Sequence, residues 1–139
     1  MKIMLSLLIC GILLLTENTH ACSCIPPLPP LEALEEADAV FSGTVLSMRD
    51  RREYIQVQVD VDCAWKGSFE RRAVLYTFSD INSCSFPFET GRKYLFYAYF
   101  KNVRVNKRIL FTDLCQRTKE YSIAGEDIDE LGTENCIEE

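Results

Sequence analysis

The sequence predicts a mainly β domain: a small, closed or nearly closed barrel of five strands, with short flanking helices and disulfide staples. Three observations support this prediction. Five segments between residues 39 and 115 are rich in β-branched and aromatic residues, and turn residues separate them. One helix-forming segment precedes the strands and another follows them. An apolar leader precedes most of the cysteines, which is typical of a small exported domain.

The leader, residues 1–21, is typical of a secretory signal peptide. A lysine precedes an apolar core of about a dozen residues, and the small residues Thr19 and Ala21 stand at positions −3 and −1 before Cys22. This core is shorter than the ~20 residues that a membrane-spanning helix needs. We therefore expect residues 22–139 to form one mature domain, secreted into the extracellular space or matrix without membrane insertion. A bacterial lipoprotein signal would also place a cysteine after the cleavage site, but it prefers leucine where Thr19 stands.

The chain contains seven cysteines, of which Cys10 would leave with the signal peptide. The others are Cys22, Cys24, Cys63, Cys84, Cys115 and Cys136. Six cysteines in an exported domain predict three disulfides, for which fifteen connectivities are possible. Residues two apart in sequence rarely meet disulfide geometry, so Cys22 and Cys24 should each reach a distant partner. A zinc site of the chain's own is disfavoured, because no C-x2-C pair occurs and the only histidine, His20, lies in the leader.

Two segments have the residue pattern of short helices. Residues 29–39 (PPLEALEEADA) begin with prolines, whose missing N–H costs nothing in a first turn, and continue with acidic helix formers. In residues 122–132 (SIAGEDIDELG), Ile123, Ile128 and Leu131 recur at roughly helical intervals, and a glycine follows them. We expect these helices to flank the strands.

The clearest strand is residues 54–65 (YIQVQVDVDCAW), in which apolar residues alternate with polar ones. The aliphatic residues from Ile55 to Val61 share one face, and the same parity places Cys63 there, against the core. Further strand candidates are residues 39–48, 72–78, 93–100 and 108–115, with turn residues at 66–68, 89–93 and 101–107. Five strands between two helices favour the oligonucleotide/oligosaccharide-binding (OB) fold, the commonest small barrel of this kind.

Charge and composition disfavour several functions. The net charge of −6 argues against nucleic acid as a partner, since phosphate binding needs a clustered basic surface. Acids interrupt the basic run at residues 49–53 (RDRRE), which we interpret as a solvated turn. We interpret the aromatic residues of 93–100 as core and rim packing rather than base-stacking platforms. The mature chain has no histidine for the usual hydrolytic sites, so we expect no enzymatic activity.

Residues 22–45 (CSCIPPLPPLEALEEADAVFSGTV) resemble the opening of the tissue inhibitors of metalloproteinases. The mature chains of that family begin with Cys, a small hydroxyl residue, Cys, an aliphatic residue and Pro. The likeness continues through residues 64–67 (AWKG), 83–98 (SCSFPFETGRKYLFYA) and 114–118 (LCQRT), so it covers most of the mature chain. The resemblance implies that residues 22–139 form a netrin-like inhibitory domain, which is a version of the OB-fold barrel.

The resemblance implies an inhibitor of matrix metalloproteinases or related zinc metalloendopeptidases, acting as a monomer in 1:1 complexes. In that family the amino nitrogen and carbonyl oxygen of the first residue, here Cys22, chelate the catalytic zinc of the protease. Ser23 would enter the specificity pocket beside the zinc. The rest of the implied contact surface consists of Cys24, Ile25 and Pro26 along the cleft, with Ile81, Asn82, Ser83 and Cys84 beside them. The zinc belongs to the protease, so no cofactor is expected in this chain.

The resemblance also implies the disulfides Cys22–Cys84 and Cys24–Cys115, which leave Cys63–Cys136 as the third. This chain departs from the family at several points. Leu34 stands where the family usually has a cysteine, Cys63 is extra, and Ser85 replaces a usual glycine. We also expect no counterpart of the second, smaller domain of the vertebrate members.

The alternative function is a netrin-like extracellular module that binds another protein or a matrix component without inhibiting a protease. Modules of that kind usually follow other domains, so that their first cysteine has no free amine. Cleavage directly before Cys22 would free this amine, which favours the inhibitor.

Overall fold

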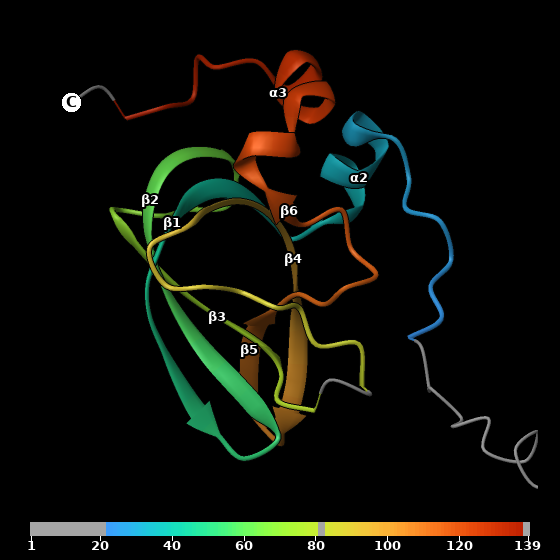
Figure 1. Ribbon diagram of the computed structural model, residues 1–139, viewed down its shortest axis with the longest axis vertical. Coiled ribbons are helices and arrows are strands. Elements are labelled where there is room, and N and C mark those ends of the chain that lie inside the picture. The colour runs from blue at the N-terminus through green and yellow to red at the C-terminus, as the bar shows by residue number, and fades with distance from the viewer. Residues whose placement is uncertain (1–21, 81–82, 138–139) are drawn as a thin grey trace, which may run out of the picture.

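The computed structural model describes residues 22–80 and 83–137 (Figure 1). The expected signal peptide, residues 1–21, lies outside the described residues. The elements in chain order are α2 (Pro30–Glu36), β1 (Ala39–Arg51), β2 (Tyr54–Lys66), β3 (Arg72–Phe78), β4 (Lys93–Arg104), β5 (Lys107–Phe111), β6 (Lys119–Glu120), the 3-10 helix η2 (Tyr121–Ile123) and α3 (Gly125–Leu131). Among the described residues, no helix has the length and apolar character needed to span a bilayer.

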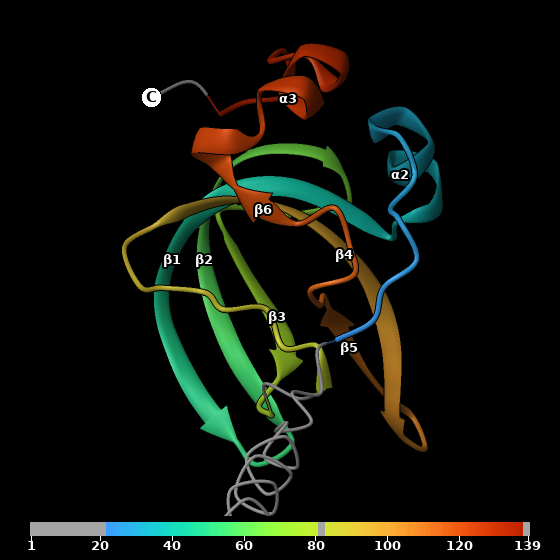
Figure 2. The ribbon, with the colours of Figure 1, turned by 45° about the vertical axis from the view of Figure 1, so that its right-hand side comes forward.

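Five strands form a ring. β1 pairs antiparallel with β2 along one edge and with β4 along the other. β3 lies antiparallel to β2, and β5 lies antiparallel to β4. A parallel bridge between Tyr76 and Phe111 joins β3 to β5, so the order β1-β2-β3-β5-β4 returns to β1. Figures 1 and 2 place α2 and α3 at one end of the ring and the turns of the β1–β2 and β4–β5 hairpins at the other. The predicted mainly β architecture with flanking short helices is confirmed.

The inside of the ring is filled by alternate side chains of the strands. On β2, Val57, Val59 and Val61 are buried, whereas the polar residues between them are exposed or half-buried, so the predicted alternation is confirmed. The rings of Phe41 and Phe96 stack here, with centroids 4.8 Å apart. Each fully buried aliphatic or aromatic side chain contributes about 1.5–3 kcal/mol, so this cluster is a principal source of stability.

A second apolar cluster lies between the outside of the ring and the two helices. Its buried members are Val40, Leu95, Tyr97, Ala124 and Leu131. Leu34 of α2 packs against them, so an apolar contact occupies the position where the resemblance expects a cysteine. The indole Nε1 of Trp65 donates a hydrogen bond of 2.9 Å to the carbonyl oxygen of Gly132. Gly132 has a φ of 79° and ends α3, as the sequence predicts.

Both hairpins are longer than the sequence indicates. The predicted strand ends at 48 and 100 are wrong, because β1 continues to Arg51 and β4 to Arg104. The ladders reach the turns, pairing Arg51 with Tyr54 and Arg104 with Lys107. Each turn then needs only two residues, and positive φ values at Arg52 (71°) and Asn106 (62°) accommodate it. The solvated turn predicted at 49–53 is therefore restricted to residues 52–53.

The last predicted strand, residues 108–115, is also too long, since β5 ends at Phe111. Beyond it, the backbone N–H of Thr112 still donates to the carbonyl oxygen of Tyr76 at 3.0 Å, and the Thr112 hydroxyl donates to the carbonyl oxygen of Tyr97 at 2.9 Å. Asp113 then caps a turn by accepting a hydrogen bond of 2.9 Å from the backbone N–H of Cys115. This turn aims residue 115 toward the N-terminal segment.

A disulfide between Cys63 and Cys136 fastens the segment after α3 to β2, with a Cα–Cα distance of 3.8 Å. Backbone hydrogen bonds flank it, from Ala64 to Asn135 at 3.0 Å and from Ile137 to Asp62 at 2.6 Å. This is the pair that the resemblance leaves as the third disulfide. Cys63 is buried, as its place on the apolar face of β2 predicts.

Candidate functional site

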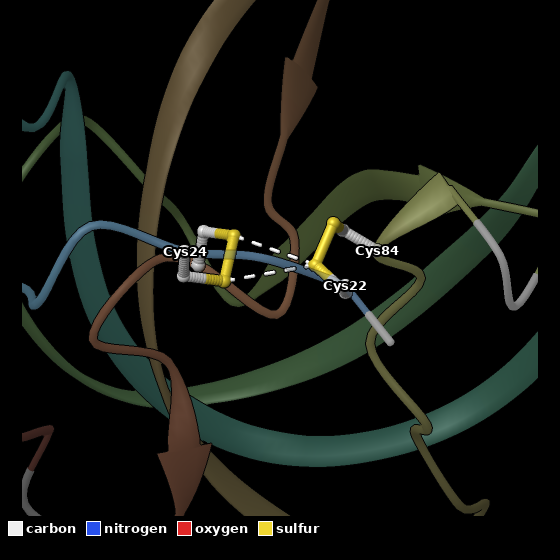
Figure 3. Close-up of side chains that lie close together, drawn as sticks. Cys22, Cys24 and Cys84 are labelled. Carbon is white, nitrogen blue, oxygen red and sulfur yellow. Dashed lines mark hydrogen bonds between the residues drawn. A yellow bond between two sulfur atoms is a disulfide. The ribbon is translucent and has the colours of Figure 1, made fainter. Parts of the chain in front are cut away.

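Three segments meet at one side of the ring: the N-terminal residues 22–28, the loop around Cys84, and the turn that leads out of β5. Two disulfides join them, Cys22–Cys84 and Cys24–Cys115, each with a Cα–Cα distance of 5.1 Å. Figure 3 shows the two bridges side by side. Both are pairs that the resemblance implies. The N-terminal segment is therefore fastened at two positions only two residues apart.

The N-terminal ridge, defined here as residues 22–26, is exposed along most of its length. Cys22 is half-buried by its disulfide, whereas the side chains of Ser23, Cys24, Ile25 and Pro26 are exposed. Ile25 is 88% exposed, so its side chain contributes almost nothing to the core. An apolar side chain displayed on a rigid backbone is suited to contact with another molecule.

The segment beside the ridge is only partly described. Ser83 is exposed and Cys84 is half-buried, while Ile81 and Asn82 lie outside the described residues. Cys84 adopts a positive φ of 65°, and its carbonyl oxygen accepts a hydrogen bond of 2.9 Å from the N–H of Leu114. The loop that carries Cys84 and the turn that carries Cys115 are thus joined to each other as well as to the ridge.

The four sulfur atoms of these disulfides lie within 4.8 Å of one another. The Sγ of Cys22 is 3.6 Å from the Sγ atoms of both Cys24 and Cys115. Four sulfur atoms this close together resemble a thiolate metal site. All four are bonded in disulfides, however, and offer no thiolate. These sulfur atoms are therefore not available as thiolate ligands.

A buried carboxylate supports the turn beneath Cys24. Besides accepting from the N–H of Cys115, Asp113 accepts a hydrogen bond of 3.3 Å from the hydroxyl of Tyr99. Burial, and then the neighbouring Asp113, raise the pKa of Tyr99, so this hydroxyl stays protonated and can donate. Sequence reasoning interpreted Tyr99 as core and rim packing and assigned no role to Asp113.

Arg117 fixes the chain where it leaves the ridge. Its Nη1 donates to the carbonyl oxygen of Leu28 at 3.1 Å, while Nε and Nη2 donate to the fully buried carboxylate of Asp127. Lys119 and Tyr97 also donate to Asp127, at 2.7 and 2.9 Å. Burial alone would raise the pKa of Asp127, but the hydrogen bonds from Arg117, Lys119 and Tyr97 lower it to about 2.

This ion cluster was missed by sequence reasoning. Arg117 lies in the LCQRT motif and Asp127 in the acidic run of the predicted last helix, but nothing in either pattern pairs them. The signal that could have identified the cluster is an acid close to isoleucine and leucine in a short helix. A carboxylate on the apolar face of such a helix is buried and must then be paired.

A cavity of about 420 Å3 lies beside residues 25–28, which are the last two residues of the ridge and the two that follow it. Residues 25–28 line one side of it, and the other lining residues are Ala33, Glu36, Ala37, Tyr97, Tyr99, Cys115, Gln116 and Arg117. Residues 25–28 therefore pass over the domain surface as a strap, held at one end by Cys24–Cys115 and at the other by Arg117. In this arrangement the side chains of Ile25 and Pro26 are exposed to solvent.

Comparison of the chain with protein-family models gave no match, and comparison with curated proteins gave none either.

Proposed function

We propose that this protein is a secreted inhibitor of zinc metalloproteinases, belonging with the tissue inhibitors of metalloproteinases and folded as a netrin-like OB-fold domain. Its targets would be matrix metalloproteinases or related zinc metalloendopeptidases. One observation carries the proposal. An exposed Cys-Ser-Cys-Ile-Pro ridge is fastened at both cysteines, directly after a predicted signal-peptide cleavage site.

The chemistry of this ridge suits a catalytic zinc ion. After cleavage before Cys22, the α-amino group would have an ordinary pKa of about 8, and a nearby metal cation favours its neutral form. The amino nitrogen and the carbonyl oxygen of Cys22 can close a five-membered chelate ring on one metal ion. A catalytic zinc in a protease keeps a coordination position open for water or substrate, and this chelate would occupy it.

The remaining ridge residues would follow the substrate cleft of the protease. The exposed side chain of Ser23 would enter the pocket beside the zinc. Cys24, Ile25 and Pro26 would extend along the cleft, while Ser83 and Cys84, with Ile81 and Asn82, would form a second contact. Because folding already orders the ridge, less of the contact energy would be lost on binding.

The test compares the refolded protein that begins at Cys22 with the same protein carrying one additional alanine before Cys22. The added residue converts the amine into an amide, which cannot coordinate zinc. We expect inhibition of a matrix metalloproteinase by the first form and a loss of potency of at least about 100-fold in the second. Disulfide mapping and circular dichroism should show the same fold for both.

Absence of inhibition by either folded form, across a panel of metalloproteinases, would overturn the proposal. That outcome would favour the alternative of a netrin-like module that binds an extracellular protein or matrix component.

A further inference from the structure

The segment Arg49-Asp50-Arg51-Arg52 is a motif that the proposed function does not use. Adjacent basic residues also occur at Arg71-Arg72, Arg92-Lys93 and Lys107-Arg108. The residue two places before each pair distinguishes the first from the others. It is Arg49 before Arg51-Arg52, whereas the other three pairs have Phe69, Thr90 and Val105 at this place. The chain therefore holds one segment of the pattern Arg-x-Arg-Arg.

The side chains of this segment are accessible. Arg49, Arg51, Arg52 and the following Glu53 are all exposed. Within residues 22–80 and 83–137, none of the three arginines forms an ion pair with a carboxylate. Arg51 donates one hydrogen bond of 3.1 Å, from Nε to Oε1 of Gln56, at the surface. The three guanidinium groups are thus available to another molecule.

The backbone that leads into the turn is extended and has an open edge. β4 pairs with β1 only over Ala39–Thr44, whereas residues 47–51 of β1 pair with β2 on one side alone. Residues 46–51 are exposed throughout. An exposed edge strand can pair with a strand of another protein. Serine proteases of the subtilisin type bind the residues before the cleaved bond in this extended form.

The turn itself is held by few contacts. Arg52 has a φ of 71°, and its N–H donates to Oδ1 of Asp50 at 2.9 Å. The hydroxyl of Ser79 donates to the carbonyl oxygen of Arg52, and the N–H of Ser79 donates to that of Glu53 at 3.0 Å. Opening the turn breaks these bonds but releases Arg52 from the unfavourable left-handed region. Exposed turn tips of this kind are preferred sites of proteolytic cleavage.

We propose that the Arg52–Glu53 peptide bond is a processing site for a dibasic-specific serine protease of the secretory pathway. Acidic pockets of such a protease would hold the guanidinium groups of Arg49, Arg51 and Arg52 through charge-assisted hydrogen bonds. The bond between the carbonyl carbon of Arg52 and the nitrogen of Glu53 breaks. Water supplies a hydroxyl group to that carbon and a proton to that nitrogen.

The disulfides determine what this cleavage produces. Cys22–Cys84 and Cys24–Cys115 both join residues 22–52 to residues 53–139, whereas Cys63–Cys136 lies within the second fragment. The pairing of β1 with β2 and β4 also remains. The product is therefore a folded two-chain protein whose N-terminal ridge is still fastened. This inference shares export from the cell with the proposed function, but it does not depend on protease inhibition.

The first test incubates the folded mature protein with a purified protease that requires Arg-x-(Lys/Arg)-Arg before the cleaved bond. The product should run as one band without reducing agent and as two bands with it, and sequencing should find a new amino terminus at Glu53. Arg49→Gln should slow cleavage at least about tenfold. Arg71→Gln is the matched control, because it removes one exposed arginine from another basic pair, and its rate should stay within about twofold of the parent.

Circular dichroism should show the same fold for the parent, both variants and the cleaved product. Resistance of the folded parent, under conditions that cut a peptide of residues 46–57, would overturn the proposal. Comparable cleavage after Arg72 or Arg108, or equal rates for Arg49→Gln and the parent, would also overturn it.

The second test expresses the full chain in animal cells. Part of the parent protein in the medium should be the two-chain form, and Arg49→Gln should appear as a single chain. Export of the parent only as an uncut chain, or no export, would count against processing in the secretory pathway.

Discussion

The guanidinium of Arg117 holds the carboxylate of Asp127 through two hydrogen bonds, of 2.6 Å from Nε to Oδ1 and 3.0 Å from Nη2 to Oδ2. The same guanidinium donates to the carbonyl oxygen of Leu28. One residue therefore connects α3 to Leu28, the last residue of the strap. The stability of the ion cluster and the position of the strap are linked through Arg117.

Asp127→Asn should destabilise the protein by about 3 kcal/mol, because it leaves Arg117 and Lys119 without their buried counter-charge. The measurement is the free energy of unfolding in urea at neutral pH. Asp129→Asn is the matched control, since Asp129 is an exposed acid of the same helix. Equal effects of the two substitutions would contradict a special role for the ion cluster.

The stability of the protein should also depend on pH through Asp127. Its folded-state pKa of about 2 lies below the ordinary value of 3.8, so its carboxylate contributes stability above the unfolded-state pKa. This contribution, roughly 2 kcal/mol, should be lost as the pH falls through about 2. Urea unfolding at a series of acidic pH values should show a steeper loss in the parent than in Asp127→Asn. Parallel curves would exclude this linkage.

Two disulfides that close loops of similar length should differ in their effect on inhibition. Cys24–Cys115 and Cys63–Cys136 span 91 and 73 residues, so removal of either should cost about 4 kcal/mol of stability. Replacing Cys24 and Cys115 by alanine leaves the ridge fastened only by Cys22–Cys84 and should weaken protease inhibition about tenfold. Replacing Cys63 and Cys136 should leave inhibition unchanged at temperatures where the variant is folded. An equal loss of inhibition in both variants would count against a specific ordering role for Cys24–Cys115.

Gly43→Ala should destabilise the ring by about 2 kcal/mol through overpacking. A Cβ at Gly43 would lie 2.3 Å from the carbonyl oxygen of Asp60 and 2.6 Å from Cγ1 of Val59. Gly125→Ala is the control, because a Cβ there has no neighbour within 4 Å and alanine is the better helix former. Thermal unfolding should show a lower midpoint for the first variant and an equal or higher one for the second.

Ser23→Gly should change which metalloproteinases are inhibited, because the proposed function places this exposed side chain in the pocket beside the zinc. The measurement is the inhibition constant against a panel of metalloproteinases with pockets of different size. Ser68→Gly, at another exposed position, should leave the profile unchanged. An unaltered profile for Ser23→Gly would remove Ser23 from the specificity contact.

Local patterns predicted much of this fold. The alternation in residues 54–65 identified β2, and Gly132 marked the end of α3, because both depend on neighbours in sequence. Residues 101–107 misled the prediction, since their polar composition suggests a loop although cross-strand pairing extends β4 to Arg104. Strand length at a hairpin depends on the partner strand, which local composition does not report.

The contacts that position the candidate site depend on ring closure. Leu28, Arg117 and Asp127 come from three separate segments, and only the folded ring brings them into hydrogen-bonding distance. The cleft of about 610 Å3 that Arg52 and Arg104 line has the same origin, because these residues lie on hairpins about fifty residues apart. The basic run at 49–53 gave no indication that Arg104 and Lys107 would lie beside it.

The crowding of four sulfur atoms at the ridge has a consequence for oxidative folding. Cys22 Sγ lies 3.6 Å from both sulfurs of the neighbouring bridge. If an external thiolate opened one bridge as a mixed disulfide, the freed cysteine could attack the other bridge, and closure to Cys22–Cys115 with Cys24–Cys84 would release that thiolate again. The two isomers have identical mass. A refolded sample with a single mass could therefore contain a fraction in which the ridge is held by the exchanged disulfides. Refolding in the presence of a disulfide isomerase should raise the inhibitory activity per mole of protein.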